Sequence, residues 1–417
     1  MPFEKTVLDN GVTVVTESMS GVRSAALGLW VRTGSRDELP QTGGISHFME
    51  HMLFKGTPTR SALEISAAFD ALGAEANAFT TKEQTCFYAR MMDEKLGPCF
   101  ELLADMLVNA SFEPQAAALE REVVIEEIAR SEDTPDEYVF DLFSAASLPG
   151  CALGRPILGT RAVVAGFGQE DLRAYHGASY VGGNVTVACC GNIEHAQLVE
   201  LASEHLAALK PGLRRVRPAL QHAAPLRVSA LQKESEQAHV VLGCPAVSQS
   251  DPRRYAYALV DAALGGSMSS RLFTEVREKR GLAYSVFSTS QLFEDCGQFM
   301  VYAGTRPENL SQVLQILQSE LQRMARQGMG QDELDRVCEM VCGSYVLGQE
   351  SPRSHMLRLG KMACSGMELY ELDQTLQSYR AVTLEDVNAA AAELLSQELT
   401  AAVISPCPVQ EVEGMVG

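Results

Sequence analysis

The sequence has no long apolar run and no leader-like N-terminus. Its first residues, MPFEKTVLDNG, do not place a basic segment before an apolar stretch, and nowhere do about 18 uncharged apolar residues run together. We therefore expect a cytoplasmic protein that makes no membrane contact. Low-complexity tracts are also missing, and a composition that is 46% hydrophobic and 21% charged is typical of a folded globular protein rather than a disordered one.

The sequence has fewer basic than acidic side chains. Lys and Arg number 34 against 53 Asp and Glu, which leaves a formal net charge of −19 at pH 7. A surface of this sign repels nucleic acid and favours neutral or cationic partners, such as a basic peptide. An equally good interpretation is that the acidity only keeps the protein soluble. The charge therefore argues against a nucleic-acid partner and leaves the substrate open.

The cysteines lack the pairing expected of a disulfide framework. There are eleven, an odd number scattered over both halves, and Cys189 and Cys190 are adjacent in an apolar run, VTVACC, that predicts a buried strand. We expect reduced thiols. Cys338 and Cys342 lie four apart on a predicted helix and have the spacing to share a metal. No further Cys or His pair completes a ligand set, so ordinary packing is the better interpretation.

The length of the chain and an irregular, proline-rich segment near its middle indicate two domains. A chain of 417 residues exceeds what one hydrophobic core usually supports. Residues 209–226, LKPGLRRVRPALQHAAPL, hold three prolines and three arginines and show no sustained period. We therefore expect an N-terminal domain over 1–212 and a C-terminal domain over 223–417.

Strands and helices mix in both halves without a strict βαβ alternation, which favours the α+β class. Because the second half repeats the style of the first, we expect two similar domains, each a mostly antiparallel sheet with helices packed on it. The main predicted helices are 45–54, 61–72, 94–109, 114–131, 194–208, 253–264, 270–279 and 308–327, and the main predicted strands are 25–32, 77–90, 184–190 and a pair within 283–304.

The predicted helix 45–54 carries the sharpest chemical motif in the chain. His47 and His51 are four apart, so both imidazoles project from one face and can bind one metal. Glu50 falls beside them, where a carboxylate can take a proton from the water that attacks an amide. The order HFMEH matches the inverted zinc motif H-x-x-E-H. Alone, it competes evenly with a simpler interpretation, two surface histidines and a helical glutamate.

A third metal ligand is available in the helix 114–131, within ALEREVVIEEIARSED. Glu120 and Glu127 are seven apart, nearly two turns, so they share a face, and Val123 and Val124 lie on the same side, which turns both carboxylates inward. Glu126 points about 100° away from Glu127, toward solvent. We therefore expect Glu127 to be the ligand and Glu120 to support the site from behind.

Taken together, these motifs resemble the pitrilysin family (M16) of inverted-motif zinc peptidases, in the half-length branch that includes the mitochondrial processing peptidase and bacterial relatives. The resemblance spans nearly the whole chain, and the order and spacing of its segments are highly specific. The segments are GGISHFMEHMLFKGT at 43–57, EANAFTTKEQTCFYA at 75–89, EREVVIEEI at 120–128 followed by SEDTPDEYVFD, LGRPILGT at 153–160, and GGSMSSRLFTEVREKRGLAYSV at 265–286.

The resemblance implies roles for individual residues of the N-terminal half. His47, His51 and Glu127 would bind one Zn²⁺ per chain, Glu50 would be the general base, and Glu120 would orient the site. Asn77 and Ala78 match the pair on an edge strand where the family binds substrate by strand addition, a mode that reads the peptide backbone. Glu83 matches an acidic position of the same segment, for which bracing of a zinc histidine is the expected role.

In the second half, Arg277 and Tyr284 match the family's arginine and tyrosine pair that holds the substrate carbonyl and the developing oxyanion. Cationic and phenolic donors suit that oxygen in the transition state. Alone, VREKRGLAY is better explained as a helix end with a glycine stop. Arg280 is the rival for Arg277, but the seven-residue spacing to Tyr284 favours Arg277.

The chain is half as long as four-domain members of the family. A complete chamber would then need a second subunit, and the presence of both the zinc motif and the arginine and tyrosine pair resembles members that form homodimers. The leading hypothesis is a zinc metalloendopeptidase that hydrolyses peptides or unfolded segments inside a chamber formed by a dimer. The alternatives are a non-catalytic subunit, or a peptidase that depends on a partner chain.

Overall fold

The computed structural model describes residues 3–416, which divide into two compact units. The first unit comprises the chain up to Ala129 with Arg155–Pro218 and Val346–Glu371. The second comprises Arg130–Gly154, Ala219–Tyr345 and the chain from Leu372 onward. Each unit therefore takes one segment from the other half of the sequence, and nothing in the sequence patterning indicates this exchange.

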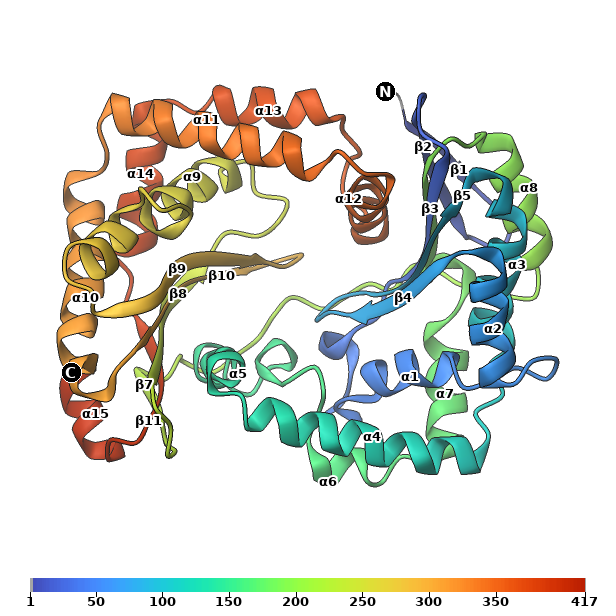
Figure 1. The fold of residues 1–417 in the computed structure, drawn as a ribbon, viewed down its shortest axis with the longest axis horizontal. Coiled ribbons are helices and arrows are strands. Elements are labelled where there is room, and N and C mark those ends of the chain that lie inside the picture. The colour runs from blue at the N-terminus through green and yellow to red at the C-terminus, as the bar shows by residue number, and fades with distance from the viewer. Residues whose placement is uncertain (1–2, 417) are drawn as a thin grey trace. The chain divides into compact units, whose positions relative to one another are not determined.

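The first unit is built on a six-stranded sheet with strand order β1-β2-β6-β3-β5-β4 (Figure 1). All neighbours are antiparallel except β2 and β6, which run parallel. Strand β4 forms one edge, so one side of its backbone has no neighbouring strand. The strands are β1 Phe3–Val7, β2 Thr13–Ser18, β3 Ser24–Val31, β4 Glu75–Thr80, β5 Thr85–Met92 and β6 Val185–Gly191.

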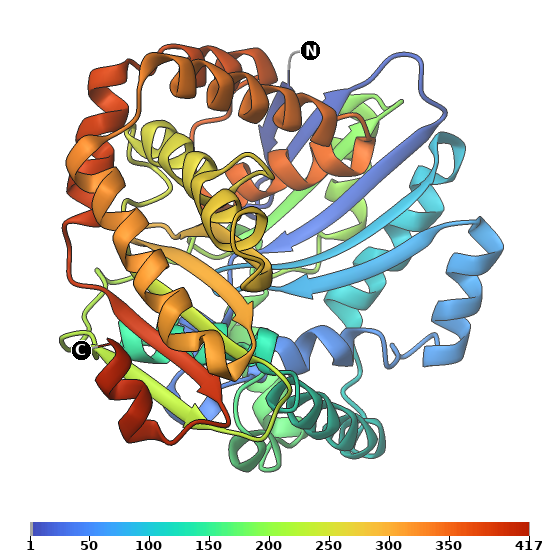
Figure 2. The ribbon, with the colours of Figure 1, turned by 60° about the vertical axis from the view of Figure 1, so that its left-hand side comes forward.

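Helices cover both faces of this sheet. The alternation of β3 sends Leu27 and Leu29 into a core with Phe48 and Leu103, while Trp30 faces the opposite side. On that side lies α12, which crosses β3 and β6 and comes from the C-terminal half (Figures 1 and 2). The helices that lie in or begin in this unit are α1 Ile45–Leu53, α2 Ala62–Leu72, α3 Leu96–Asn109, α4 Pro114–Glu132, α6 Arg161–Val164, α7 Gln169–Ser179, α8 His195–His205 and α12 Pro352–Ser365.

The second unit repeats this plan with a five-stranded sheet of order β7-β11-β8-β10-β9, in which only β7 and β11 run parallel. Helix α5, from the N-terminal half, packs Val139 and Phe143 on one face of the sheet. The strands are β7 Val228–Gln232, β8 Ala238–Ala246, β9 Ala283–Leu292, β10 Gly297–Thr305 and β11 Thr400–Ser405. The helices are α5 Pro135–Ser147, α9 Arg254–Gly265, α10 Leu310–Gln327, α11 Gln331–Gly348, α13 Leu372–Arg380, α14 Leu384–Leu395 and α15 Val409–Val416.

The prediction of two similar α+β layered units with mostly antiparallel sheets is confirmed. One local prediction was wrong. The single strand expected over 77–90 is a hairpin, because the chain turns between Thr80 and Thr85. A helix is present within 270–279 as predicted, and it is a π-helix at Phe273–Glu278, a form that is frequent at functional sites. Among residues 3–416, no helix combines the length and apolarity needed to cross a bilayer.

Candidate metal centre

Helix α1 is held at its N-terminus by a buried acidic side chain. The carboxylate of Glu38 accepts hydrogen bonds from the backbone N–H groups of Gly44 (2.7 Å) and Ser46 (2.8 Å), which satisfies donors that a helix start leaves free. Gly44 adopts φ 95°, and a Cβ there would lie 2.5 Å from the carbonyl oxygen of Leu158. Glycine is therefore required where the segment around Leu158 packs against the start of α1.

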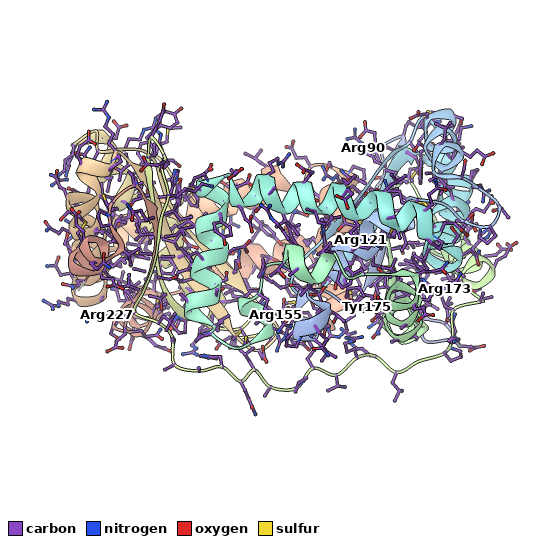
Figure 3. The ribbon with its side chains drawn as sticks, turned by 90° about the horizontal axis from the view of Figure 1, so that it is seen from below. Arg90, Arg121, Arg155, Arg173, Tyr175 and Arg227 are labelled. Atoms are coloured by element: carbon purple, nitrogen blue, oxygen red, sulfur yellow. The ribbon has the colours of Figure 1, made fainter. Side chains whose placement is uncertain are left out.

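Two further side chains fix the helices that carry the site (Figure 3). The hydroxyl of Tyr175 on α7 hydrogen-bonds to the hydroxyls of Ser46 and Thr33, each at 2.7 Å. Burial raises the pKa of Tyr175 to about 12, so the phenol stays neutral. On α4, Arg121 donates to the carbonyl of Phe167 at 2.8 Å. Both α1 and α4 are thus anchored to the chain that follows α6.

His47, His51 and Glu127 come together at the face where α1 meets α4. Oε2 of Glu127 lies 3.6 Å from Nε2 of His47 and 3.6 Å from Nε2 of His51, and the two imidazole centroids are 4.6 Å apart. Within residues 3–416 this is the one group of three or more His, Cys, Asp or Glu side chains whose donor atoms converge as a metal site requires. The spacing predicted on each helix therefore becomes a real three-dimensional cluster.

The donor set fits a divalent transition metal. Two imidazole nitrogens and one carboxylate oxygen within 4.8 Å of one another are the ligands of catalytic zinc sites, which keep a position open for water or substrate. Burial and the nearby positive charge of His51 lower the pKa of His47 to about 3, so this imidazole is neutral and has a free lone pair. The residues that would hold zinc are therefore the three predicted ones.

Glu120 supports His51 from behind. Nδ1 of His51 donates to Oε1 of Glu120 at 2.7 Å, and Oε2 of Glu120 pairs with Nζ of Lys55 at 2.7 Å. Although burial alone would raise the pKa of Glu120, the hydrogen bonds from His51 and Lys55 lower it. A carboxylate on the far nitrogen fixes the tautomer that leaves Nε2 free for a metal. Sequence reasoning missed Lys55, although it lies one turn after His51.

On helix α4, Glu127 lies in the converging cluster and Glu126 does not. Glu120 and Val124 are buried, Glu127 is partly buried, and Glu126 is exposed. Val123 departs from the expectation, because its side chain is half exposed rather than buried. The face that turns Glu120 and Glu127 inward is therefore narrower than the sequence pattern suggested.

Glu50 is held by a residue that the sequence did not single out. Oγ1 of Thr80, the last residue of β4, donates to Oε2 of Glu50 at 2.5 Å. Burial raises the pKa of Glu50, and this hydrogen bond opposes the rise. The contact joins α1 to the edge strand, so the carboxylate beside the metal ligands is oriented by the same strand that carries Asn77 and Ala78.

Asn77 and Ala78 lie on β4, whose outer edge is open. Asn77 pairs with Tyr88 and Ala78 with Phe87 across the hairpin, and no strand of the sheet covers the other side of β4. Oδ1 of Asn77 accepts from the N–H of Ala78 at 2.8 Å. Open backbone groups beside a metal site are the arrangement that strand addition of a peptide requires.

Glu83 is placed differently from the expectation. Nδ1 of His47 has no hydrogen-bond partner and Nδ1 of His51 is taken by Glu120, so Glu83 braces neither histidine. Its carboxylate instead accepts from Nη1 of Arg36 at 2.6 Å and lies 3.9 Å from Nη1 of Arg217. Both guanidinium groups come from segments far away in sequence, which no local pattern reveals.

Arg277 and Tyr284 are neighbours in the second unit. Nη1 of Arg277 donates to the carbonyl of Tyr284 at 2.8 Å, its guanidinium lies 4.9 Å from the centre of the Tyr284 ring, and Tyr284 is 79% exposed. The rival, Arg280, is taken up by an ion pair with Glu275 at 2.6 Å. The structure thus pairs Arg277 with Tyr284, while their role toward substrate stays a prediction.

Two protein-family models match this chain, one in each half. A family model described as "Insulinase (Peptidase family M16)" matches residues 13–161, and one described as "Peptidase M16 inactive domain" matches residues 166–341. A Streptomyces coelicolor protein named an uncharacterized zinc protease is 42% identical over 415 residues, which cover 96% of this chain and 89% of that protein. A Bacillus subtilis protein of the same description is 40% identical, over 95% of this chain and 97% of that protein.

Solved structures share the fold. A peptidase M16 inactive domain from Pseudomonas fluorescens superposes with a TM-score of 0.91, covering 98% of each chain. A protease from Helicobacter pylori superposes with a TM-score of 0.90, covering 97% of this chain and 99% of that one. Each is 22% identical in sequence, so these two similarities concern the fold alone.

Proposed function

This chain belongs to peptidase family M16, and from that premise we propose that it is a zinc-dependent endopeptidase that hydrolyses peptides or unfolded segments. One observation carries the proposal. The two Nε2 atoms of His47 and His51 and Oε2 of Glu127 converge, and the carboxylate of the neighbouring Glu50 lies outside this cluster and is oriented by Thr80. A metal site with an adjacent free base is what hydrolysis of an amide requires.

Each residue has a separate task. When bound, zinc would supply Lewis-acid polarisation of the scissile carbonyl and of the attacking water. Glu50 takes the proton from that water and returns it to the leaving amine, and burial favours this because it raises the pKa of the carboxyl. Thr80 keeps Oε2 of Glu50 in place, and Glu120 keeps His51 in the binding tautomer.

The substrate binds in an extended form along the open edge of β4, where Asn77 and Ala78 present backbone groups. This mode recognises the peptide backbone, so it accepts many sequences but only unfolded ones. The net charge of −19 favours basic peptides. The chain works in the cytoplasm as a homodimer, in which Arg277 and Tyr284 of a second copy complete the chamber and stabilise the oxyanion.

A non-catalytic or partner-dependent subunit is the second candidate, because the model that matches residues 166–341 is described as an inactive domain. That match lies outside the segment with His47, Glu50, His51 and Glu127, and the segment 13–161 matches the other model. The complete ligand set with its base favours the active form.

A test of the proposal uses the purified chain and a mixed library of short peptides, with a chelator, and then with zinc restored. We expect cleavage that stops with chelator and returns with zinc. The variant Glu50→Gln should keep one zinc per chain and lose nearly all turnover, since its ligands remain while the base is gone. Zinc loss in that variant would make Glu50 a ligand, and a zinc-loaded wild type that cleaves nothing would favour the non-catalytic or partner-dependent subunit.

A further inference from the structure

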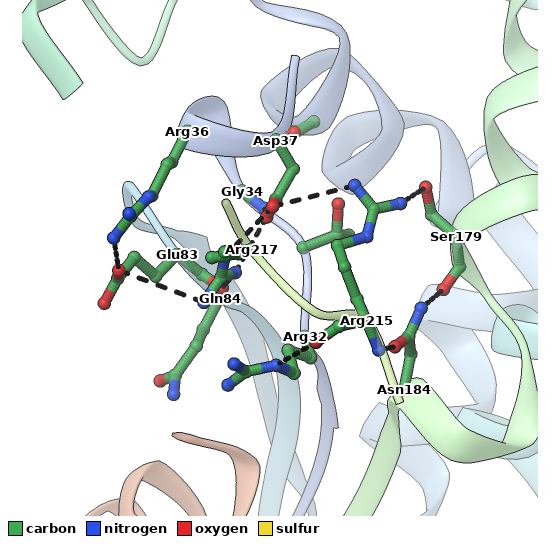
Figure 4. Close-up of polar contacts among 12 residues, drawn as sticks. Arg32, Gly34, Arg36, Asp37, Glu83, Gln84, Ser179, Asn184, Arg215 and Arg217 are labelled. Atoms are coloured by element: carbon green, nitrogen blue, oxygen red, sulfur yellow. Dashed lines mark hydrogen bonds and ion pairs between the residues drawn. The ribbon is translucent and has the colours of Figure 1, made fainter. Parts of the chain in front are cut away.

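We propose that Arg217, in the connecting segment 209–226, is a positioning residue that holds the turn between β4 and β5 and thereby the strand on which the peptide is bound. This inference rests on the proposed function, because it assigns a purpose to the placement of β4. The side chain of Arg217 joins the connecting segment to the six-stranded sheet of the first unit through buried contacts (Figure 4).

Arg217 makes a two-pronged ion pair with Asp37. Its Nε donates to Oδ1 at 2.9 Å and its Nη2 donates to Oδ2 at 2.7 Å, and both side chains are only 4% exposed. Nη2 also donates to the backbone carbonyl of Glu83 at 2.5 Å. The planar guanidinium thus binds a carboxylate and the turn at once, which a lysine ammonium does not match in geometry.

The loop that carries Asp37 lies directly on the same turn. The N–H of Arg36 donates to the carbonyl of Lys82 at 2.7 Å, and its Nη1 donates to the carboxylate of Glu83 at 2.6 Å. A Cβ on Gly34 would lie 2.3 Å from the carbonyl oxygen of Thr81, so the two backbones touch. Arg217 therefore closes a clamp in which residues 34–37 hold the turn at 81–84.

The turn also connects the peptide strand to the metal helix. It follows Thr80, which holds Glu50, and Lys82 donates from Nζ to the carbonyl of Arg155 at 2.5 Å. Arg155 in turn donates to the carbonyl of Glu38, the residue whose carboxylate caps α1. A shift of the turn would therefore move the peptide relative to Glu50, and small misplacements at a reacting centre are costly.

Leu209 and Leu220 of the connecting segment pack against apolar clusters, but hydrophobic burial does not explain its path next to Arg217. Leu213 and Val216 are 94% and 88% exposed, whereas Arg217 beside them is buried. A buried ion pair is weak evidence for stability, because desolvation offsets most of the attraction. The inverted pattern of apolar residues outside and a charge inside therefore favours a positioning role at the turn.

Arg215 provides a matched control in the same segment. It also ties the segment to the first unit, since its backbone N–H donates to Asn184 at 2.8 Å and its Nη2 donates to Ser179 at 3.0 Å. Its side chain lies 3.7 Å from Asp37 and makes no contact with the turn. Arg215→Gln removes the same charge from the same segment and gives up only the longer, 3.7 Å contact with Asp37, while the hydrogen bonds of Arg217 to Asp37 and to the turn stay in place.

The experiment compares the full-length wild type with Arg217→Gln, Arg217→Lys and Arg215→Gln. Zinc content, KM and kcat are measured on one defined peptide, the bond cleaved in a longer peptide is mapped by mass spectrometry, and hydrogen exchange is followed over residues 75–85. For Arg217→Gln we expect normal zinc, a roughly tenfold rise in KM, cleavage spread to neighbouring bonds and faster exchange in β4 and its turn. Arg217→Lys should be intermediate, and Arg215→Gln should match the wild type.

The two proposals fail in different ways. A zinc-loaded wild type that leaves every peptide intact overturns the proposed function, and the exchange measurement still decides whether Arg217 holds the turn. Exchange and cleavage position unchanged in Arg217→Gln overturn the inference while the peptidase assignment stands. Equal losses in Arg217→Gln and Arg215→Gln also overturn it, since general anchoring of the segment would then be sufficient.

Discussion

Thr80 and Glu50 are joined by a hydrogen bond from Oγ1 to Oε2, although they come from different elements thirty residues apart. Thr80 ends the edge strand β4, and Glu50 lies on α1 between the two histidines that face the metal site. The base of the proposed reaction is therefore oriented by the strand that receives the peptide. Strand β4 would thus position both the peptide and the general base.

Thr80→Val should lower kcat by roughly tenfold to a hundredfold, because a hydrogen bond to a carboxylate contributes about 1.5–3 kcal/mol. Valine keeps the β-branched shape that suits a strand, so the fold and the zinc content should stay as in the wild type. Steady-state turnover with zinc analysis of the same sample checks this. Thr80→Ser, which keeps the hydroxyl, is the control. Equal activity of Thr80→Val and the wild type would show that Thr80 is not needed to orient Glu50.

Glu127→Gln should weaken zinc binding by at least about a hundredfold, since it removes the only anionic ligand of the cluster, whereas even supporting residues change affinity by about 10–100-fold. Competition with a chromogenic chelator measures the affinity directly. Glu126→Gln removes the same charge from the next position of α4, where the side chain is exposed, and should leave zinc affinity unchanged. If Glu126→Gln weakened zinc binding and Glu127→Gln did not, Glu126 rather than Glu127 would be the ligand.

The parts of the site that sequence could predict are those with local spacing. The separation of His47 and His51 and that of Glu120 and Glu127 follow from helical periodicity, and the structure brings all four together. Thr80, Lys55 and Glu38 carry no such signature, because their roles depend on contacts between separate elements. Glu83 was misjudged for the same reason, since its partner Arg217 lies 134 residues further along the chain.

The fold shows a similar limit. Sequence patterning can indicate an apolar face on a helix but not the sheet that buries it, so the exchange of the α5 and α12 segments between the two units was not foreseen. The hairpin β4–β5 was missed because its turn, residues 81–84, is TKEQ and lacks the glycine, proline or asparagine that usually marks a tight turn. Long-range contacts, rather than local propensity, fix both features.

Acid should loosen α12 from the first sheet. Glu17 on β2 is buried against His355 (3.0 Å) and Arg358 (2.8 Å) of α12. Burial alone would raise the pKa of Glu17, but the hydrogen bond with His355 and the charges of His355 and Arg358 lower it below its ordinary value of 4.5. A lowered folded pKa contributes stability above the unfolded value, and this stability is lost as pH falls through the folded pKa.

The expected result is a red shift of tryptophan fluorescence below about pH 4.5, because Trp30, the single tryptophan, packs against α12. Glu17→Gln should lower the free energy of unfolding at neutral pH by about 3–5 kcal/mol, as expected when a buried ion pair loses one partner. Glu4→Gln, on the exposed side of β1, is the control and should change neither measurement. If acid left the fluorescence of Trp30 unchanged, the charge of Glu17 would not be needed to hold α12 on the sheet.

Gly360 in α12 should tolerate no side chain. A Cβ built there would lie 2.1 Å from Nε1 of Trp30, and both residues are buried in the core between α12 and the sheet. Gly360→Ala should lower the free energy of unfolding by about 1–3 kcal/mol through overpacking, although alanine is the better helix former. Gly177→Ala in α7, an exposed helical glycine with nothing within 4 Å of the added Cβ, should instead raise it by about 0.5–1 kcal/mol. Denaturant titration of both variants gives the two signs. A stabilised Gly360→Ala would mean that Trp30 moves aside without loss, and that α12 packs less tightly on β3 than this contact requires.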